Sequence, residues 1–389
     1  MTTNPPPFAQ ERYLSGILEL VCQNMELTPT QYQDAKAKYE AVSGWLADSD
    51  DPRLANGLIF PQGSMRLGTT VKPLGRDEFD IDLVAQLGYA QYDTPTEVYR
   101  AIGARLSANK TYKALLEPKN RCWRLNYAES SGLHMDITPA IHNTSCNNGG
   151  LLVPDRELSD WSPSNPAGYA DWFEQRADLK PTMLYLETAR LRADIAPLPE
   201  QIRLKGPLKR IIQLCKRHRD VLFAGDSSGT APISIILTTL AAQAYEYLVL
   251  TRHFSNEYEL VIAVISAMPN FIRIDESHGG WRYYIDNPTT EGENFAERWN
   301  KHPERASAFY RWHEKMTADL NELMNVHGLD GVVRYMGENI TGTRDAKNIA
   351  KLVTERVTAA RDAGVLKSTA LGLGLTSGQT VHGNTFYGE

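Results

Sequence analysis

Apolar residues recur at helical spacing in the part of the chain that follows Thr28. They are Tyr32, Ala35, Tyr39, Val42 and Leu46. Thr28 suits the N-cap and Pro29 the first helical position, so a helix is predicted to begin here. The polar run from Asp48 to Pro52 is expected to end it. The preceding residues 1–12 are polar and proline-rich and indicate a loosely held arm.

Two stretches alternate acidic or polar residues with apolar ones, which is typical of half-buried strands. They are FDIDLVAQL (79–87) and HMDITPAI (134–141). The segment CWRLNYA (122–128) precedes the second stretch and is joined to it by Glu-Ser-Ser-Gly, which predicts a hairpin. Residues 94–109 favour a helix. Residues 142–170 are rich in Asn, Ser, Gly and Pro and indicate a long surface loop.

From about residue 171 the apolar spacing becomes helical. The predicted helices are 171–193, 205–222, 231–251, 256–267, 295–324 and 344–362. Residues 363–389 are rich in Gly, Ser and Thr, carry only two charges and are expected to form a flexible tail. The pattern therefore predicts an α+β region followed by a mostly α region.

The composition is that of a globular enzyme and excludes several other classes. The 389 residues allow two or three domains or one large bilobal unit. No apolar run reaches the roughly 18 to 20 residues of a membrane helix, and the first residues do not resemble a secretion signal. The cysteines are scattered, at Cys22, Cys122, Cys146 and Cys215. This scatter argues against disulfides and structural zinc and predicts a cytoplasmic protein.

Charge narrows the expected ligand. The formal net charge is −6. Proteins that coat long nucleic acids need many positively charged side chains to contact the phosphates, so this charge argues against that class. A local basic stretch, 201–219, contains seven Lys and Arg residues and no acid. An acidic chain with one basic stretch suits a small polyphosphate better than a polynucleotide, so we expect no long nucleic acid and no membrane among its partners.

The first candidate for chemistry is the acidic pair Asp80 and Asp82. Residues i and i+2 of a strand point to the same face, so both carboxylates project side by side. The alternate positions, Phe79, Ile81 and Leu83, are expected to turn into the core. Two carboxylates on one face repel each other unless a divalent ion bridges them. Taken alone, the pair is equally compatible with a half-exposed edge strand.

Two further segments extend this pattern. In IFPQGSMRLGTT, Gly63 lets the backbone approach a phosphate and Ser64 adds a hydroxyl donor, although such a pair alone more often marks a turn. Asp136, in LHMDITPAI, supplies the third carboxylate of a two-metal site, although alone it is more often a strand-end or turn residue. In this order the segments match the pattern hG[GS]…DhD…D, which is typical of polymerase-β-like nucleotidyltransferases.

With this pattern the chain resembles the bacterial CD-NTases, or cGAS/DncV-like nucleotidyltransferases, of CBASS antiphage defence. The resemblance spans residues 55–300. The matching segments are FPQGSMRLGTTVKPLG (60–75), DEFDIDLV (77–84), CWRLNYAE with HMDITPAI (122–141), VPDRELSDWSPSNPAGYADWF (153–173), LKRIIQLCKRHRD (208–220) and PISIILTTL (232–240). The interval from Ser64 to Asp80 is long for the superfamily but normal for this branch.

The resemblance implies a bilobal fold. In such a fold a polymerase-β-like nucleotidyltransferase core packs against a helical C-terminal lobe, and nucleotides bind in the cleft. The expected parts are an N-terminal arm (1–27), the core with its N-terminal helix (28–200), the helical lobe that completes the cleft (201–362) and the tail (363–389).

The resemblance also implies roles for individual residues. Asp80, Asp82 and Asp136 match the catalytic carboxylates that bind two Mg²⁺ ions, for which Mn²⁺ can substitute. The residues expected at the nucleotide are Gln62, Gly63, Ser64, Arg124, Lys216 and Ser234. Arg124 is equally suited to an ion pair with its strand neighbours. Without the resemblance, Lys216 would be a charge on a solvated helix face and Ser234 a helix cap.

The implied activity joins nucleoside triphosphates, ATP or GTP or both, into a cyclic di- or trinucleotide with release of pyrophosphate. A 2′–5′ oligoadenylate-type enzyme, or another polymerase-β-like nucleotidyltransferase with a linear product, is the alternative. A catalytically silent nucleotide sensor and a plain helical binding module are alternatives from other classes.

The end of the tail suggests a protein partner. Phe386 and Tyr387 form an apolar pair on a polar tether, which suits capture by a groove of another protein. In some relatives the C-terminal residue is joined covalently to target proteins. This chain ends in Glu389 instead of a small residue, so it departs from that pattern.

Overall fold

The computed structural model describes residues 7–74, 79–91, 93–127, 132–146, 148–157, 159–183, 205–276, 280–364, 367–369, 372–374 and 379–380. The chain forms two compact units. Unit 1 comprises Met1–Met25, Leu179–Tyr283 and Arg298–Glu389, and unit 2 comprises Glu26–Asp178 and Tyr284–Glu297. Each unit therefore consists of separate stretches of chain. The core (28–200) and the helical lobe (201–362) predicted from the sequence are each one continuous stretch.

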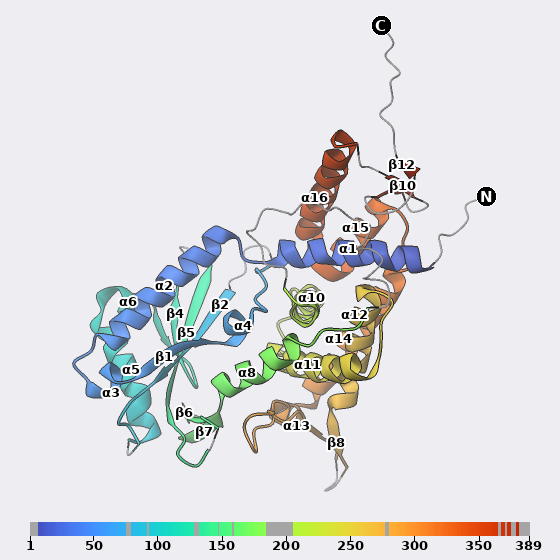
Figure 1. Cartoon of the computed structure of the whole chain (residues 1–389). Helices are drawn as coiled ribbons and strands as arrows, with labels where there is room; N and C mark the ends of the chain where they lie inside the picture. Colours follow the sequence, from blue (N-terminus) through green and yellow to red (C-terminus); the bar gives the residue numbers. More distant parts are fainter. Residues whose placement is uncertain are drawn as a thin grey trace. The chain divides into compact units, whose positions relative to one another are not determined.

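Unit 2 is built on a seven-stranded sheet (Figure 1). Five strands lie in the order β1 (Leu58–Gln62), β2 (Phe79–Gln86), β5 (Leu133–His142), β4 (Trp123–Asn126) and β3 (Leu116–Pro118). β6 (Leu151–Asp155) pairs with β5, and β7 (Asp160–Ser164) pairs with β6. Only the pair β2–β5 is parallel among these strands. The predicted strands and the β4–β5 hairpin are confirmed.

The helices in the described part of unit 2 include two that begin with capping boxes. The helices are α2 (Pro29–Ala47), α3 (Pro52–Ala55), α4 (Gly63–Leu67), α5 (Pro95–Ala108), α6 (Lys110–Leu115) and α8 (Pro166–Ala177). Thr28 and Gln31 form a capping box at α2, and Thr94 and Glu97 form one at α5. α5 and α6 lie in the connection that returns the chain to the sheet before β5. The predicted helices at 29–47 and 94–109 are confirmed.

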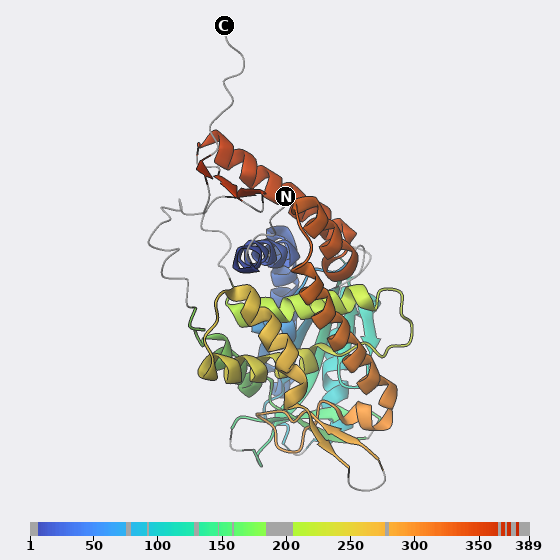
Figure 2. The ribbon, with the colours of Figure 1, turned by 90° about the vertical axis from the view of Figure 1, so that its right-hand side faces the viewer.

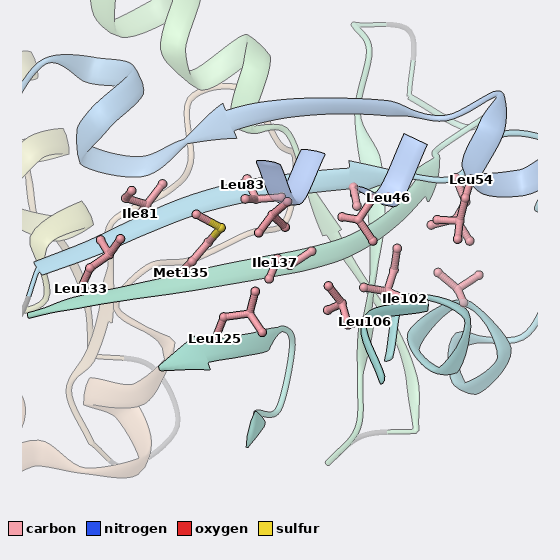
Figure 3. Close-up of a cluster of buried hydrophobic side chains, with 14 of the residues drawn as sticks. Leu46, Leu54, Ile81, Leu83, Ile102, Leu106, Leu125, Leu133, Met135 and Ile137 are labelled. Carbon is pink, nitrogen blue, oxygen red and sulfur yellow. The ribbon is translucent and has the colours of Figure 1, made fainter. Parts of the chain in front are cut away.

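One face of the sheet packs on a hydrophobic core (Figure 3). Ile81 and Leu83 of β2 and Met135 and Ile137 of β5 are buried there, together with Ile102 of α5. These strand residues alternate with the acidic ones, because side chains of a strand point to opposite faces in turn. The predicted burial of the apolar half of β2 is confirmed, and it leaves the acidic half on the other face.

The stretch 142–170 contains regular structure, so its assignment to a long loop is wrong. β6 and β7 form an antiparallel hairpin within it, and α8 begins at Pro166. Leu151 and Val153 of β6 are buried and pack with Val84 of β2. The Asn, Ser, Gly and Pro residues of the stretch concealed the hairpin, although β6 itself begins with the apolar run Leu151, Leu152 and Val153.

Unit 1 is mostly helical. Its helices of eight or more described residues are α1 (Pro7–Met25), α10 (Pro207–Leu222), α11 (Ser234–Thr251), α12 (Glu257–Ala267), α14 (Pro303–Leu323), α15 (Leu329–Met336) and α16 (Thr343–Asp362). A two-stranded sheet, β8 (Arg273–Asp275) with β9 (Arg282–Tyr284), follows α12 in the sequence. The predicted helices at 205–222, 231–251, 256–267 and 344–362 are confirmed.

Two of the predicted helices need correction. The stretch 295–324 is divided into α13 (Glu297–Lys301) and α14, because Pro303 occupies the first position of a new helix. The stretch predicted as 171–193 is helical only to Ala177, where α8 ends. Residues 184–193 lie outside the described part of the chain.

The N-terminal segment is a helix from residue 7, so its assignment to a loosely held arm is wrong there. Leu14, Leu18, Val21 and Met25 are buried at helical spacing along α1. α1 packs against α10, α12 and α16, and it is seen almost end-on when the molecule is turned (Figure 1; Figure 2). The proline-rich start concealed this amphipathic pattern, which only begins several residues later.

The C-terminal stretch contains a small sheet within the segment expected to be a flexible tail. β10 (Lys367–Thr369) pairs with β11 (Gly372–Gly374) and with β12 (Gln379–Thr380). Backbone pairing, which composition does not report, forms these strands, so the flexible assignment is wrong for them. The aromatic pair Phe386–Tyr387 lies outside the described residues.

The four cysteines lie in the described residues, and none of them forms a disulfide. Within the described part of the chain, no helix combines the length and apolarity needed to cross a membrane.

Candidate active site

One face of the sheet in unit 2 carries a row of polar residues at matching register. Gln62 of β1 lies opposite Asp82 of β2, and Asp82 lies opposite Asp136 of β5. Arg124 of β4 lies opposite Asp136, and Glu117 of β3 lies opposite Arg124. Strand pairing therefore brings residues from five strands into one line across the sheet.

Asp80 shares this face because it lies two positions before Asp82 in β2. Its side chain is 53% exposed, whereas that of Asp136 is 15% exposed. The three candidate catalytic carboxylates thus lie on two adjacent parallel strands, on the face that the core of Figure 3 does not cover. Their placement agrees with the face predicted from alternation.

Gly63 occupies a backbone position that disfavours any other residue. Its φ is +62°, in the left-handed region that side chains disfavour. A Cβ at this position would lie 2.2 Å from Oδ2 of Asp82. The glycine is therefore needed for the turn between β1 and α4 and also for the close approach of that turn to a candidate catalytic carboxylate.

Ser64 and Gln62, on either side of this glycine, are both held by threonines. The hydroxyl of Thr70 donates to Oγ of Ser64 at 3.2 Å, and the backbone N–H of Thr69 donates to the carbonyl of Ser64 at 2.9 Å. Nε2 of Gln62 donates to Oγ1 of Thr138 at 3.1 Å. These contacts orient the loop that is expected to bind a triphosphate.

Arg124 forms a two-pronged ion pair with Asp136. Nε donates to Oδ1 at 2.7 Å, and Nη2 donates to Oδ2 at 2.8 Å. Nη2 also lies 3.6 Å from Oδ1 of Asp80. The hydrogen bonds to Asp136 raise the pKa of Arg124 further above its ordinary value, so the guanidinium stays charged. Of the two roles expected for Arg124, the structure contains the ion pair with a neighbouring strand.

Four residues that contribute to this face were not identified from the sequence. They are Thr70, Glu117, Cys122 and Thr138. Burial raises the pKa of the Cys122 thiol to about 12, and the neighbouring carboxylate of Asp136 adds to this, so the thiol is neutral. Cys122 and Thr138 each lie two positions from a candidate site residue, so strand alternation was a usable signal. Thr70 offered none.

The carboxylates suit a divalent metal by their chemistry, because hard cations prefer oxygen ligands. Among the described side chains, however, no three or more His, Cys, Asp or Glu residues gather closely enough to hold a metal ion. Arg124 instead supplies positive charge between Asp136 and Asp80. By their chemistry the three carboxylates fit Mg²⁺, but their side chains must move before they can surround an ion.

Lys216 and Ser234, the other residues expected at the nucleotide, belong to unit 1. Lys216 of α10 is 5% exposed, so it does not lie on a solvated helix face. Ser234 is the first residue of α11, and the N-cap position is taken by Ile233. Nη1 of Arg219 donates to Oγ of Ser234 at 3.0 Å. Lys216 is therefore not a charge on a solvated helix face, and Ser234 is not the N-cap of its helix.

α10 buries two charged or titratable side chains directly after Lys216. Arg217 pairs with Asp345 at 3.3 Å, and Nε2 of His218 lies 3.0 Å from Oδ2 of Asp319. Burial lowers the pKa of His218, so this imidazole favours its neutral form. Burial alone would raise the pKa of Asp319, but hydrogen bonds from His218 and other partners hold it below its ordinary value. These contacts fix the position of α10.

A cavity of about 340 Å³ lies on the other side of the sheet in unit 2. Its lining includes Trp123, which precedes Arg124 in β4 and so points to the opposite face. Two polar groups of the wall have partners within the protein: the hydroxyl of Tyr99 donates to the carbonyl of Lys119, and Asp155 accepts from Arg121. This cavity is separate from the row of candidate site residues.

The fold matches solved structures of known class. The CD-NTase CdnG of Bradyrhizobium diazoefficiens, in complex with GTP, matches with a TM-score of 0.68 and 23% identity, over 87% of this chain and 97% of that chain. The CdnC:HORMA-deltaN complex of E. coli MS115-1 matches with a TM-score of 0.56 and 14% identity, over 84% and 96%. The fold is thus that of the cGAS/DncV-like, polymerase-β-type nucleotidyltransferases.

The sequence gives the family. Residues 14–177 match the Second Messenger Oligonucleotide or Dinucleotide Synthetase (SMODS) domain. A c-di-GMP synthase of Roseivirga ehrenbergii is 33% identical over 323 residues, which are 82% of this chain and 81% of the relative. The protein belongs to the CD-NTases, bacterial nucleotidyltransferases that make cyclic oligonucleotides from nucleoside triphosphates in CBASS antiphage defence.

Membership in this family confirms the predicted class of fold and activity. Nucleotidyltransferases of this family generally use divalent metal ions. The roles of Asp80, Asp82, Asp136 and the residues expected at the nucleotide stay predictions.

Proposed function

We propose that this protein joins two molecules of GTP into cyclic di-GMP and releases two molecules of pyrophosphate. The observation that carries the proposal is the 33% identity, over 82% of the chain, to a c-di-GMP synthase. The matching CdnG structure contains GTP, which supports a guanine nucleotide. A purine also offers a larger stacking surface than a pyrimidine.

The row of polar residues on the sheet supports roles for the three carboxylates. Asp136 would lie beside the ribose hydroxyl that attacks, and Asp80 and Asp82 would lie beside the triphosphate. Two Mg²⁺ ions held by these carboxylates would supply activation of the hydroxyl and neutralisation of the leaving pyrophosphate. The register of β2 and β5 supports this assignment, because it places the carboxylates on one exposed face.

The remaining candidates would bind the triphosphate. The left-handed turn at Gly63 brings backbone close to Asp82, and the oriented hydroxyl of Ser64 can donate to a phosphate oxygen. Gln62 would support this loop through its bond to Thr138. Lys216 and Ser234 would hold phosphates of the donor nucleotide, and Arg124 would contact a nucleotide phosphate once it is released from Asp136.

The test is to incubate the purified protein with Mg²⁺ and either GTP alone or all four ribonucleoside triphosphates, and to identify the products by mass spectrometry. We expect cyclic di-GMP from GTP alone and as the main product of the mixture. Digestion with a 3′–5′-specific phosphodiesterase then identifies the linkage. A product made only of pyrimidines, or a ladder of linear oligomers, contradicts the proposal.

We further propose that the protein acts in the cytoplasm, where its nucleotide substrates are found, and that a protein partner engages the C-terminal tail. The tail is polar and ends in an aromatic pair, Phe386 and Tyr387. The matching CdnC structure is a complex with HORMA-deltaN, which shows that a protein of this fold binds a protein partner. Affinity purification with the full chain and with a chain lacking residues 380–389 tests this partner.

A further inference from the structure

Arg124 is the cation at the centre of the candidate catalytic face. The register of β4 and β5 places it directly opposite Asp136, and Asp82 flanks Asp136 on the other side. The guanidinium engages both carboxylate oxygens of Asp136 and lies 3.6 Å from Oδ1 of Asp80. Arg124 therefore neutralises the carboxylates on which the proposed chemistry depends.

This charge arrangement opposes the binding of a metal ion. A divalent cation placed among Asp80, Asp82 and Asp136 would lie within a few ångströms of a permanent positive charge. Each cation lowers the affinity of the site for the other, because like charges repel strongly in a partly buried setting. The absence of a gathered metal-binding group among the described side chains agrees with this.

Arginine also binds the other component of the reaction. A guanidinium pairs with phosphate oxygens in the same two-pronged geometry that it uses with a carboxylate. The side chain of Arg124 is 24% exposed, so part of it is accessible to a ligand on this face. A triphosphate can therefore compete with Asp136 for the same N–H groups.

Resting on the proposed function, we propose that Arg124 is a substrate-binding residue that also keeps the catalytic carboxylates closed to metal until a nucleoside triphosphate binds. Without nucleotide, Arg124 holds Asp136 and Asp80 and excludes the metal. When a triphosphate arrives, Arg124 exchanges Asp136 for phosphate oxygens. The carboxylates are then released to hold the metal ions that enter with or after the nucleotide. The expected order of binding is nucleotide before the complete metal set.

Two calorimetric titrations test this order without any measurement of turnover. In the first, Mn²⁺ alone is titrated into the nucleotide-free protein. We expect Arg124→Gln to bind Mn²⁺ about tenfold or more tightly than the wild type, because a nearby unit charge is removed. In the second, GTP is titrated in the presence of EDTA. Here we expect Arg124→Gln to bind about tenfold or more weakly, because a charge-assisted pair with phosphate is lost.

The opposite signs of these two effects are the signature of the proposal. A variant that is only damaged structurally would lose affinity for both ligands. Arg100→Gln is the matched control, because Arg100 is an exposed arginine of α5 in the same unit and lines the cavity on the other side of the sheet. It should leave both affinities within about twofold of the wild type, since surface charges act weakly at a distance.

Arg124→Lys provides a second variant that keeps the charge but loses the two-pronged geometry. We expect its affinity for Mn²⁺ to stay near that of the wild type and its metal-free affinity for GTP to fall. Equal or weaker Mn²⁺ binding by a folded Arg124→Gln protein overturns the proposal, as does a loss of both affinities in Arg124→Lys. The Mn²⁺ result does not depend on which product is made, so a failure to find cyclic di-GMP would reject the proposed function separately.

Discussion

The sheet of unit 2 and the helices α10 and α11 of unit 1 position their candidate site residues by different physical means. In the sheet, Asp82, Asp136 and Arg124 are neighbours because paired strands share a register. In α10, Lys216 stands beside Arg217 and His218, whose buried side chains hold the helix through contacts with other helices. Backbone geometry places the first group, whereas side-chain contacts place the second.

This difference predicts how each region responds to substitution. The sheet offers no alternative position for a carboxylate that is removed, so effects there should be close to all-or-none. Phosphate contacts from helices can be shared among several groups, so effects there should be graded and should appear mainly in affinity. The predictions below run from the largest expected effect to the smallest.

The largest effect should follow Asp82→Ala. Removing this carboxylate takes a ligand from the proposed two-metal site, and we expect conversion of GTP to fall by about 10³-fold or more. The measurement is the initial rate of pyrophosphate release, with circular dichroism to verify the fold. Asp34→Ala is the control, because Asp34 pairs with Lys38 on α2, away from the sheet face. A folded Asp82→Ala protein within about tenfold of the wild type would reject the metal role.

Gly63→Ala tests the close approach of the loop to the sheet. A Cβ would meet Oδ2 of Asp82 at 2.2 Å, so the loop or the carboxylate must move. We expect the rate to fall on the order of 10²-fold, because displacements of about an ångström have such effects in catalysis. Gly149→Ala is the matched control: Gly149 has a φ of +81° but no atom within 4 Å of the added Cβ. Equal losses in both variants would show that backbone strain alone is responsible.

Lys216→Ala should change affinity more than rate. If Lys216 binds phosphates equally in the ground and transition states, its loss raises KM by about tenfold, the scale of one charged hydrogen bond, and lowers kcat much less. Steady-state kinetics with GTP measure this split. Lys347→Ala, an exposed position on α16, should change neither constant. A large loss of kcat at constant KM would place the action of Lys216 in the transition state alone.

Arg219 should act through Ser234. Because Arg219 orients the Ser234 hydroxyl at 3.0 Å, Arg219→Gln and Ser234→Ala should each raise KM by roughly three- to tenfold, the range of one hydrogen bond. The double variant should be no worse than the single ones, since both remove the same contact. Additive effects would mean that Arg219 touches the nucleotide independently.

Deleting residues 380–389 should have the smallest effect. The deletion removes Thr380, the last residue of β12, and the residues after it, and we expect turnover by the purified protein to stay within about threefold of the wild type. In cells, regulation that depends on a partner should be impaired. A greater loss of turnover in the purified protein would mean that this segment supports the catalytic body.

Much of the local structure was predictable because its signals are local. Thr28 and Thr94 begin helices through capping boxes that can be recognised within four residues. The alternation of acid and apolar residues around Asp80 and Asp82 predicted which face each side chain takes. Helix α1 was missed because its apolar spacing follows a proline-rich start. The β6–β7 hairpin was missed because the apolar run of β6 lies within a stretch rich in Asn, Ser, Gly and Pro.

For the candidate site, the sequence predicted which residues take part but not how they contact one another. Three separated segments in a fixed order identified Asp80, Asp82 and Asp136, because phosphoryl transfer limits which residue types can serve. Cys122 and Thr138 could have been added from alternation, but Thr70 could not, since its contact with Ser64 depends on how α4 and the following loop fold back.

The sequence by itself determined the class of chemistry, the α+β character and the two faces of β2, because residue type and periodicity act locally. Only the tertiary structure decided that Arg124 pairs with Asp136, that Gly63 lies against Asp82, and that α1 belongs with the distant helices of unit 1. Each of these facts depends on strand register or on packing between segments remote in the chain. Such contacts arise from competition among many partners in space, which spacing along one sequence does not record.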